Sequence, residues 1–115
     1  MTTKLESVHN GAFLLREDHG SISRDIGIVA SGQNLLAGTV VSLTSGKWNP
    51  FDADGSHPVG VLYNNTDATN ADTKAVVITR KAEVDAAQLI WPAGYTNTQI
   101  ANGREFLSEA GITTR

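Results

Sequence analysis

The stretch from residue 57 to residue 84 constrains the fold of this chain most strongly. It contains an apolar run at 59–62, a polar run at 64–73, and a second apolar run that includes Val76, Val77 and Ile78. β-Branched residues at this density favour buried strands, whereas Asn, Asp and Thr in a row favour turns. The pattern predicts a strand, a loop and a long second strand at the centre of the molecule.

The segment before this stretch predicts further strands of a small β-barrel. Run 26–29 indicates one strand, 31–34 a turn, and 35–43 a second strand. Gly38 allows the bend with which a strand enters a small barrel. Trp48 belongs to another short strand.

Two helices are predicted after the strands. Asp85 and Gln88 form a capping-box pattern for a short helix, which Pro92 ends. Thr96 and Gln99 form a second such pattern at the start of a longer amphipathic helix. The predicted fold class is therefore mainly β with short helices (α+β), built as one compact barrel domain.

Composition excludes several kinds of partner. The 115 residues carry a formal net charge of −3, which offers no basic patch for a phosphate backbone, so we expect no nucleic-acid partner. No signal peptide and no apolar stretch of membrane-spanning length is evident, so we expect a soluble protein without a membrane partner. The absence of cysteine fits folding in a reducing cytoplasm.

Motifs for catalysis or metal binding are not apparent. His9, His19 and His57 are too scattered for a zinc site. The Asp-Ala-Asp-Gly sequence at 52–55 lacks the spacing and the closing glutamate of a calcium loop, and is better explained as a turn. We therefore expect no enzyme activity, no catalytic residues, no cofactor and no metal.

The N-terminal 25 residues differ from the rest of the chain. Val8, Phe13 and Leu15 alternate in the manner of a strand with one buried face, yet the segment is too polar to form a core. It is either an arm that becomes ordered against a partner or an edge strand of the domain. Residues 1–25 are assigned to this arm and 26–115 to a single β-rich domain.

Three large aromatic residues are candidate anchors for the core or for an interface. They are Trp48, Trp91 and Tyr95. Aromatic side chains of this size are enriched in both settings. Core packing and a contact surface therefore both remain open for them.

A series of short motifs resembles the head decoration protein family of tailed bacteriophages, the lambda-type capsid-stabilising proteins. The order of the motifs and the chain length together carry this resemblance, which covers nearly the whole chain. The motifs are His9-x-Gly11-x-Phe13, Ser23-Arg24-Asp25, Ser31-Gly32-Gln33-x-Leu35-x-Ala37-Gly38-Thr39-Val40, Pro58-Val59-Gly60-Val61-Leu62, Ala75-Val76-Val77-Ile78-x-Arg80-x-Ala82-Glu83-Val84 and Leu107-x-x-Ala110-Gly111-Ile112-x-x-Arg115.

The resemblance implies a tulip-like β domain with an N-terminal arm and a C-terminal helix. It further implies a homotrimer made in the host bacterial cytoplasm, which binds the major capsid protein outside the expanded head at three-fold sites. There the trimer resists internal DNA pressure, without enzyme activity or cofactor. On this basis the expected capsid-binding residues are Val8, Phe13, Leu14, Leu15, Arg24 and Asp25, and the expected trimer-interface residues are Trp91 and Tyr95.

Two other functions are compatible with parts of the sequence. Run 36–40 is also similar to the entry strand of sugar-binding clip domains, which suggests a small ligand-binding barrel or an accessory domain of an enzyme. Such a domain needs a pocket with converging polar groups. A bacterial surface fibre is the second alternative, and it predicts a secretion signal or repeats.

Overall fold

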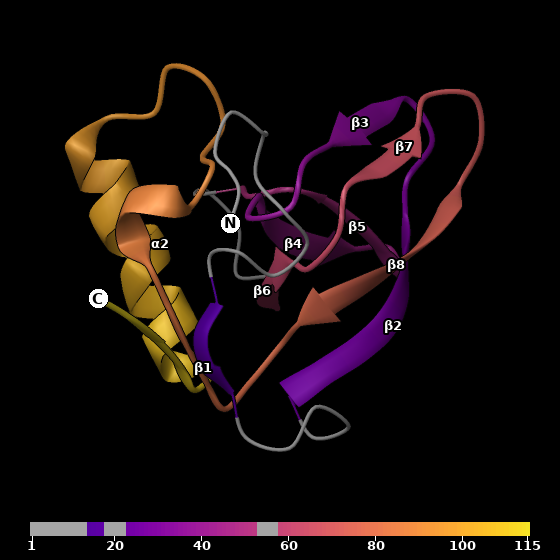
Figure 1. Cartoon of the computed structure of the whole chain (residues 1–115). Coiled ribbons are helices and arrows are strands. Elements are labelled where there is room, and N and C mark those ends of the chain that lie inside the picture. Colours follow the sequence, from indigo (N-terminus) through magenta and orange to yellow (C-terminus); the bar gives the residue numbers. More distant parts are fainter. Residues whose placement is uncertain (1–13, 18–22, 53–57) are drawn as a thin grey trace, which may run out of the picture.

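A closed five-stranded β-barrel forms the body of the protein (Figure 1). The computed structural model describes residues 14–17, 23–52 and 58–115. Around the barrel the strands follow the order β2-β5-β4-β6-β8. They are β2 (Arg24–Val29), β4 (Val40–Thr44), β5 (Lys47–Pro50), β6 (Val59–Leu62) and β8 (Thr73–Ile78). The predicted fold class is confirmed.

Smaller elements surround the barrel. Strands β1 (Leu14–Glu17), β9 (Ala82–Val84) and β10 (Ile112–Thr114) form a three-stranded sheet with β9 in the middle. Strands β3 (Gln33–Leu35) and β7 (Thr66–Ala68) form a two-stranded ribbon. In Figure 1 the helix α2 (Asn97–Glu109) lies to the left of the barrel and the ribbon to its upper right.

Strand pairing in the barrel is mostly antiparallel. Strands β2 and β8 are paired over six residues each, from Arg24 opposite Ile78 to Val29 opposite Thr73. Between β2 and β5 there is one parallel pair, Val29 opposite Trp48, which closes the barrel. Strands β3 and β4 lie between β2 and β5 in the chain, which provides the long connection that a parallel pair requires.

One core cluster fills the barrel. All five barrel strands contribute to it, and the β3–β7 ribbon adds Leu35 and Ala68 at one end. Trp48 is its largest member and lies against Gly27 of β2, where any side chain would collide with the indole ring. The barrel interior is therefore packed with side chains. The cluster consists of Val29, Leu35, Val41, Trp48, Leu62, Ala68, Ala75 and Val77.

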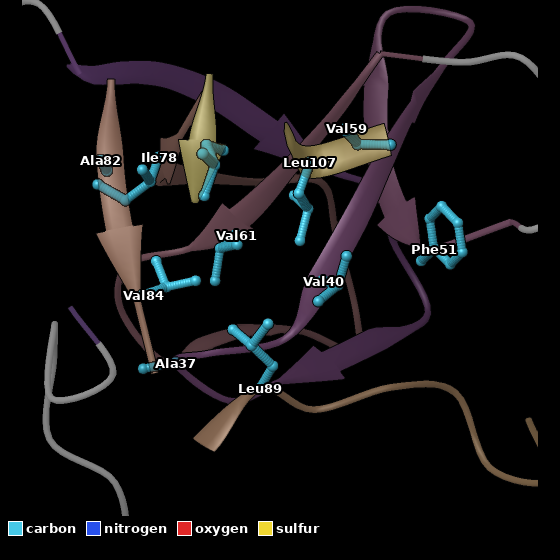
Figure 2. Packing of buried hydrophobic residues seen from close by; sticks show 11 residues of the cluster. Ala37, Val40, Phe51, Val59, Val61, Ile78, Ala82, Val84, Leu89 and Leu107 are labelled. Atoms are coloured by element: carbon cyan, nitrogen blue, oxygen red, sulfur yellow. The ribbon is translucent and has the colours of Figure 1, made fainter. Parts of the chain in front are cut away.

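A second core cluster joins the barrel to the three-stranded sheet and to α2. Figure 2 shows Val40, Val61, Val84 and Leu107 from four different elements pointing toward a common centre. Because the second apolar surface lies outside the barrel, the sheet and the helix are needed to cover it. The cluster consists of Ala37, Val40, Phe51, Val59, Val61, Ile78, Ala82, Val84, Leu89, Leu107 and Ile112.

The long strands predicted from the sequence are divided in the structure. The polar run 64–73 was expected to be a loop, but it contains β7, which pairs with β3. The second apolar run breaks into β8 and β9, and Lys81 takes a left-handed φ of 53° at the break. Run 35–43 is likewise interrupted between β3 and β4, where Gly38 has a φ of 94°.

The two predicted helices differ in outcome. The first is wrong as an α-helix, because it is a single 3-10 turn, η1 (Ala86–Gln88), although Asp85 caps it as predicted by accepting a hydrogen bond from the backbone N–H of Ala87. The second is confirmed as α2. Thr96 and Gln99 form its capping box through reciprocal side-chain-to-backbone hydrogen bonds of 2.8 and 3.2 Å.

Candidate interaction surfaces

The N-terminal candidate residues lie at the edge of the three-stranded sheet or before it. Val8 and Phe13 lie outside the described residues. Leu14 is on β1, pairs with Val84 of β9, and packs against the second core cluster. Leu15 is on the same strand. Strand β1 is therefore part of the folded body.

Arg24 and Asp25 begin barrel strand β2, and their side chains make different contacts. The guanidinium carbon of Arg24 lies 4.0 Å from the ring centre of Tyr63, a cation–π contact. The Asp25 carboxylate accepts hydrogen bonds from Arg80 Nη2 at 2.6 Å and from the Thr79 hydroxyl at 3.0 Å. Both side chains thus have partners within the body, and Asp25 pairs with Arg80, not with its sequence neighbour.

The outer face of β2 carries Ile26 and Ile28 beside Arg24. Ile26 is 78% exposed and lies opposite Val76 of β8, while Ile28 lies opposite Lys74. Side chains at i and i+2 of a strand share a face, so Ile26 and Ile28 point outward while Gly27 faces Trp48.

Trp91 and Tyr95 precede the N-terminus of α2, and both pack against Phe51. The ring of Phe51 meets both edge-on, with centroid distances of 5.6 Å to Trp91 and 6.0 Å to Tyr95. The Tyr95 hydroxyl donates a 2.6 Å hydrogen bond to the carbonyl of Phe51. Both aromatic residues are only partly buried. They fix the loop before α2 and still present surface to the outside.

An apolar groove lies beside Trp91. It has a volume of about 250 Å³, and among the described residues no charged side chain lines it. Leu36, which is 46% exposed, forms part of its wall. The lining residues are Asn34, Leu35, Leu36, Thr39, Pro50, Ile90, Trp91 and Pro92.

A wider groove of about 570 Å³ separates the barrel from the end of α2. Its lining combines the apolar residues Leu43, Trp48 and Pro58 with four charged residues, Asp25, Arg80, Lys81 and Glu109. The sequence-based alternative of a ligand-binding barrel requires converging polar groups. Two of these charged groups, the Asp25 carboxylate and the Arg80 guanidinium, are paired with each other.

Two exposed carboxylates, one on β7 and one in the loop between β7 and β8, are held in the ionised form. A hydrogen bond from the Thr69 side chain lowers the pKa of Asp67, and its backbone N–H adds to this effect. The Lys47 ammonium, 2.7 Å away, lowers the pKa of Asp72, helped by the backbone N–H of Ser31. Both groups therefore carry a negative charge at neutral pH.

The described part of the chain shows no group of three or more His, Asp or Glu side chains close enough to hold a metal ion. Most of the Asp-Ala-Asp-Gly sequence lies outside that part. Nor does any helix in it combine the length and apolarity required to cross a membrane.

Sequence reasoning missed two surface features, the exposed Ile26 and the groove beside Leu36. Run 26–29 predicts a strand, but not which of its faces is exposed. The signal that could have located them is Gly27, because the close approach of Trp48 to this glycine marks the inner face of β2 and leaves its neighbours on the outer face.

Comparison with protein families gives one match to the chain. The model for bacteriophage lambda head decoration protein D covers residues 3–112. No curated protein matches the sequence.

Proposed function

The chain belongs to the bacteriophage lambda head decoration protein D family, and from this premise we propose that it is a homotrimer that binds the major capsid protein on the outside of the expanded head. It binds at the three-fold sites and stabilises the head against the pressure of the packaged DNA. The protein acts as a structural component of the virion, not as an enzyme, and is made in the cytoplasm of the host bacterium.

The observation that carries this proposal is the extent of the family match. It spans residues 3–112, which includes the N-terminal segment, every strand of the barrel and helix α2. A match confined to the barrel would support a shared fold alone, since one fold serves many functions. A match that also includes the segment before β1 supports a shared mode of binding.

The position of β1 supports a capsid-binding role for the N-terminal segment. β1 is an edge strand of its sheet, with β9 on one side. Leu14, the first residue of β1, therefore stands on a sheet edge. An extended segment can add to a strand edge of a partner through backbone hydrogen bonds, while Val8 and Phe13 occupy side-chain pockets.

Three such segments on one trimer increase the strength of binding. After the first has bound, the other two are held near their sites at an effective concentration set by the short tether. Modest contacts from each segment then suffice for stable attachment. Arg24 and Asp25, fixed at the start of β2, contribute at the junction between segment and body in this proposal.

Co-sedimentation with purified expanded heads tests the proposal. The full-length protein is expected to pellet with expanded heads that lack a decoration protein and to remain in solution with unexpanded heads. A variant that lacks residues 2–12 keeps all of β1 and is expected to stay folded and trimeric but to remain in the supernatant. If this variant pellets like the full-length protein, the N-terminal segment is not the capsid-binding element.

A further inference from the structure

Two large hydrophobic side chains stand out on the surface that the structure describes. Ile26 is 78% exposed and Leu36 is 46% exposed, whereas the other large hydrophobic residues of that surface are buried or partly buried. They lie on different elements, Ile26 on β2 and Leu36 after the end of β3. One projects from a strand and the other borders a groove.

The surface around Ile26 carries positive charge at its margin. Ile26 lies opposite Val76 across the β2–β8 pairing, and the next outward pair places Lys74 opposite Ile28. Lys74 is exposed. An aliphatic side chain with a lysine nearby therefore projects from the wall of the barrel.

The groove beside Leu36 is apolar and small. Its volume of about 250 Å³ lies below the usual range of about 300–1,000 Å³ for small-molecule pockets. Its walls are aliphatic, aromatic and proline side chains with two neutral polar residues. This size and lining suit one aliphatic side chain better than a polar metabolite.

Negative charge lies next to the groove. Asn34, one of its lining residues, is the cross-strand partner of Asp67 in the β3–β7 ribbon. Residues directly opposite in an antiparallel pair share a face, so the exposed Asp67 carboxylate stands on the groove side of the ribbon. The margin of the groove is thus complementary in charge to the margin of the Ile26 surface.

We infer that Ile26 of one copy of this chain inserts into the Leu36–Trp91 groove of a second copy, with Lys74 facing Asp67 across the contact. Such a contact is heterologous, because two different surfaces of the same chain meet, and it closes into a ring when the rotation between copies permits. The inference rests on the proposed homotrimer and identifies its contact. Trp91 is then a groove wall, while Tyr95 holds the loop behind it.

Complementation between two variants tests this contact. Ile26→Glu and Leu36→Glu each place a carboxylate where the contact excludes water, so each variant is expected to be monomeric in sedimentation equilibrium. An equimolar mixture retains one intact contact, formed by the groove of the first variant and Ile26 of the second. The mixture is therefore expected to contain dimers that neither variant forms alone.

A matched control places the same charge elsewhere. Thr113→Glu changes an exposed residue of β10. This strand belongs to the three-stranded sheet, which contains neither Ile26 nor a residue that lines the groove, so the variant is expected to remain trimeric. Circular dichroism of all three variants is expected to match the wild type. The inference is overturned if Ile26→Glu remains trimeric or if the mixture contains no species heavier than its components.

Charge reversal provides an independent measurement. Lys74→Glu is expected to weaken self-association about two- to fivefold per contact, the range of a partly exposed ion pair. Adding Asp67→Lys to the same chain is expected to restore it. Failure of the second change to restore association contradicts the assigned pairing.

The failure of this inference can be told apart from the failure of the proposed function. A trimer insensitive to Ile26→Glu overturns the inference alone, whereas a wild-type protein that stays monomeric at every concentration contradicts both the inference and the proposed homotrimer. Pelleting of the same samples with expanded heads is scored separately, and it depends on the decoration role alone.

Discussion

At the scale of single residues, close packing explains features that composition alone does not. Gly103 lies in the middle of α2, where glycine is intrinsically unfavourable by about 1 kcal/mol relative to alanine. It is buried, and an added Cβ would lie 2.7 Å from one ring atom of Trp91 and 3.1 Å from one of Phe51. Gly103 is therefore what lets the aromatic group approach the helix.

Replacement of this glycine by a larger residue is expected to destabilise the protein. Gly103→Ala is expected to lower stability by roughly 1–3 kcal/mol, because overpacking against Trp91 outweighs the gain in helix propensity. The matched control is Asn102→Ala on the exposed face of α2, which is expected to leave stability unchanged or slightly higher. Urea denaturation measures both. A Gly103→Ala variant as stable as Asn102→Ala contradicts the packing of Trp91 described here.

The carboxylate of Asp72 gives a second residue-scale prediction, on pH dependence. Its pKa is lowered in the folded state, so its contribution to stability is present above the pKa of the unfolded chain and is lost as pH falls through the folded value. The loss begins below about pH 4, near the ordinary aspartate pKa. Asp72→Asn is expected to flatten the fall in melting temperature on acidification.

The partner of Asp72 supplies the control for this measurement. Lys47→Met removes the ammonium that is the largest cause of the shift and is expected to flatten the acid profile in the same way. Thermal melts between neutral pH and pH 3 provide the comparison. Profiles for both variants that stay parallel to the wild type would show that the Lys47–Asp72 pair does not contribute to acid sensitivity.

At the scale of elements, β1 marks where the N-terminal segment joins the body. Leu14 packs on the second core cluster, so Leu14→Ala is expected to lower stability by roughly 1–2 kcal/mol, less than the full cost at a completely buried leucine. Phe13→Ala, one residue earlier, is expected to weaken binding to expanded heads with little change in melting temperature. A drop of several degrees for Phe13→Ala would place this residue in the core.

Short sequence motifs were sufficient to predict the elements that are stabilised by contacts between residues close together in the chain. The capping box of α2 needs only Thr96 and Gln99, and both were identified correctly. Strand β7 was missed because two of its three residues, Asp67 and Ala68, have little strand propensity, and the strand is held by pairing with β3, more than thirty residues earlier in the chain. Helix η1 ends after one 3-10 turn, because Leu89 has an extended backbone conformation and is buried in the second core cluster.

The surfaces were harder to predict than the fold. Trp91 and Tyr95 were recognised as anchors, but the groove beside them depends on Leu36 and Pro50, which lie more than forty residues away in sequence. Ile26 resembles any buried strand residue until the Trp48–Gly27 contact fixes which face of β2 is inside. Such features arise from the relative placement of strands, which periodicity does not specify.

At the scale of the whole molecule, a rigid packed body separates two kinds of contact. The barrel core and the second cluster hold β1, β2 and the groove in fixed relation. In the proposed assembly, the segment before β1 binds the capsid, and β2 and the groove join the copies. Neither proposed contact involves a chemical reaction. The proposed function therefore depends on how the two binding surfaces are placed and on how many copies assemble.

Electron cryo-microscopy of expanded, undecorated heads incubated with the purified protein tests the central claim most directly. The account predicts added density of three copies at each three-fold site on the outer surface, continuous with the major capsid protein through the N-terminal segments. Heads that remain bare at saturating protein concentration, or that carry the protein elsewhere, would contradict it.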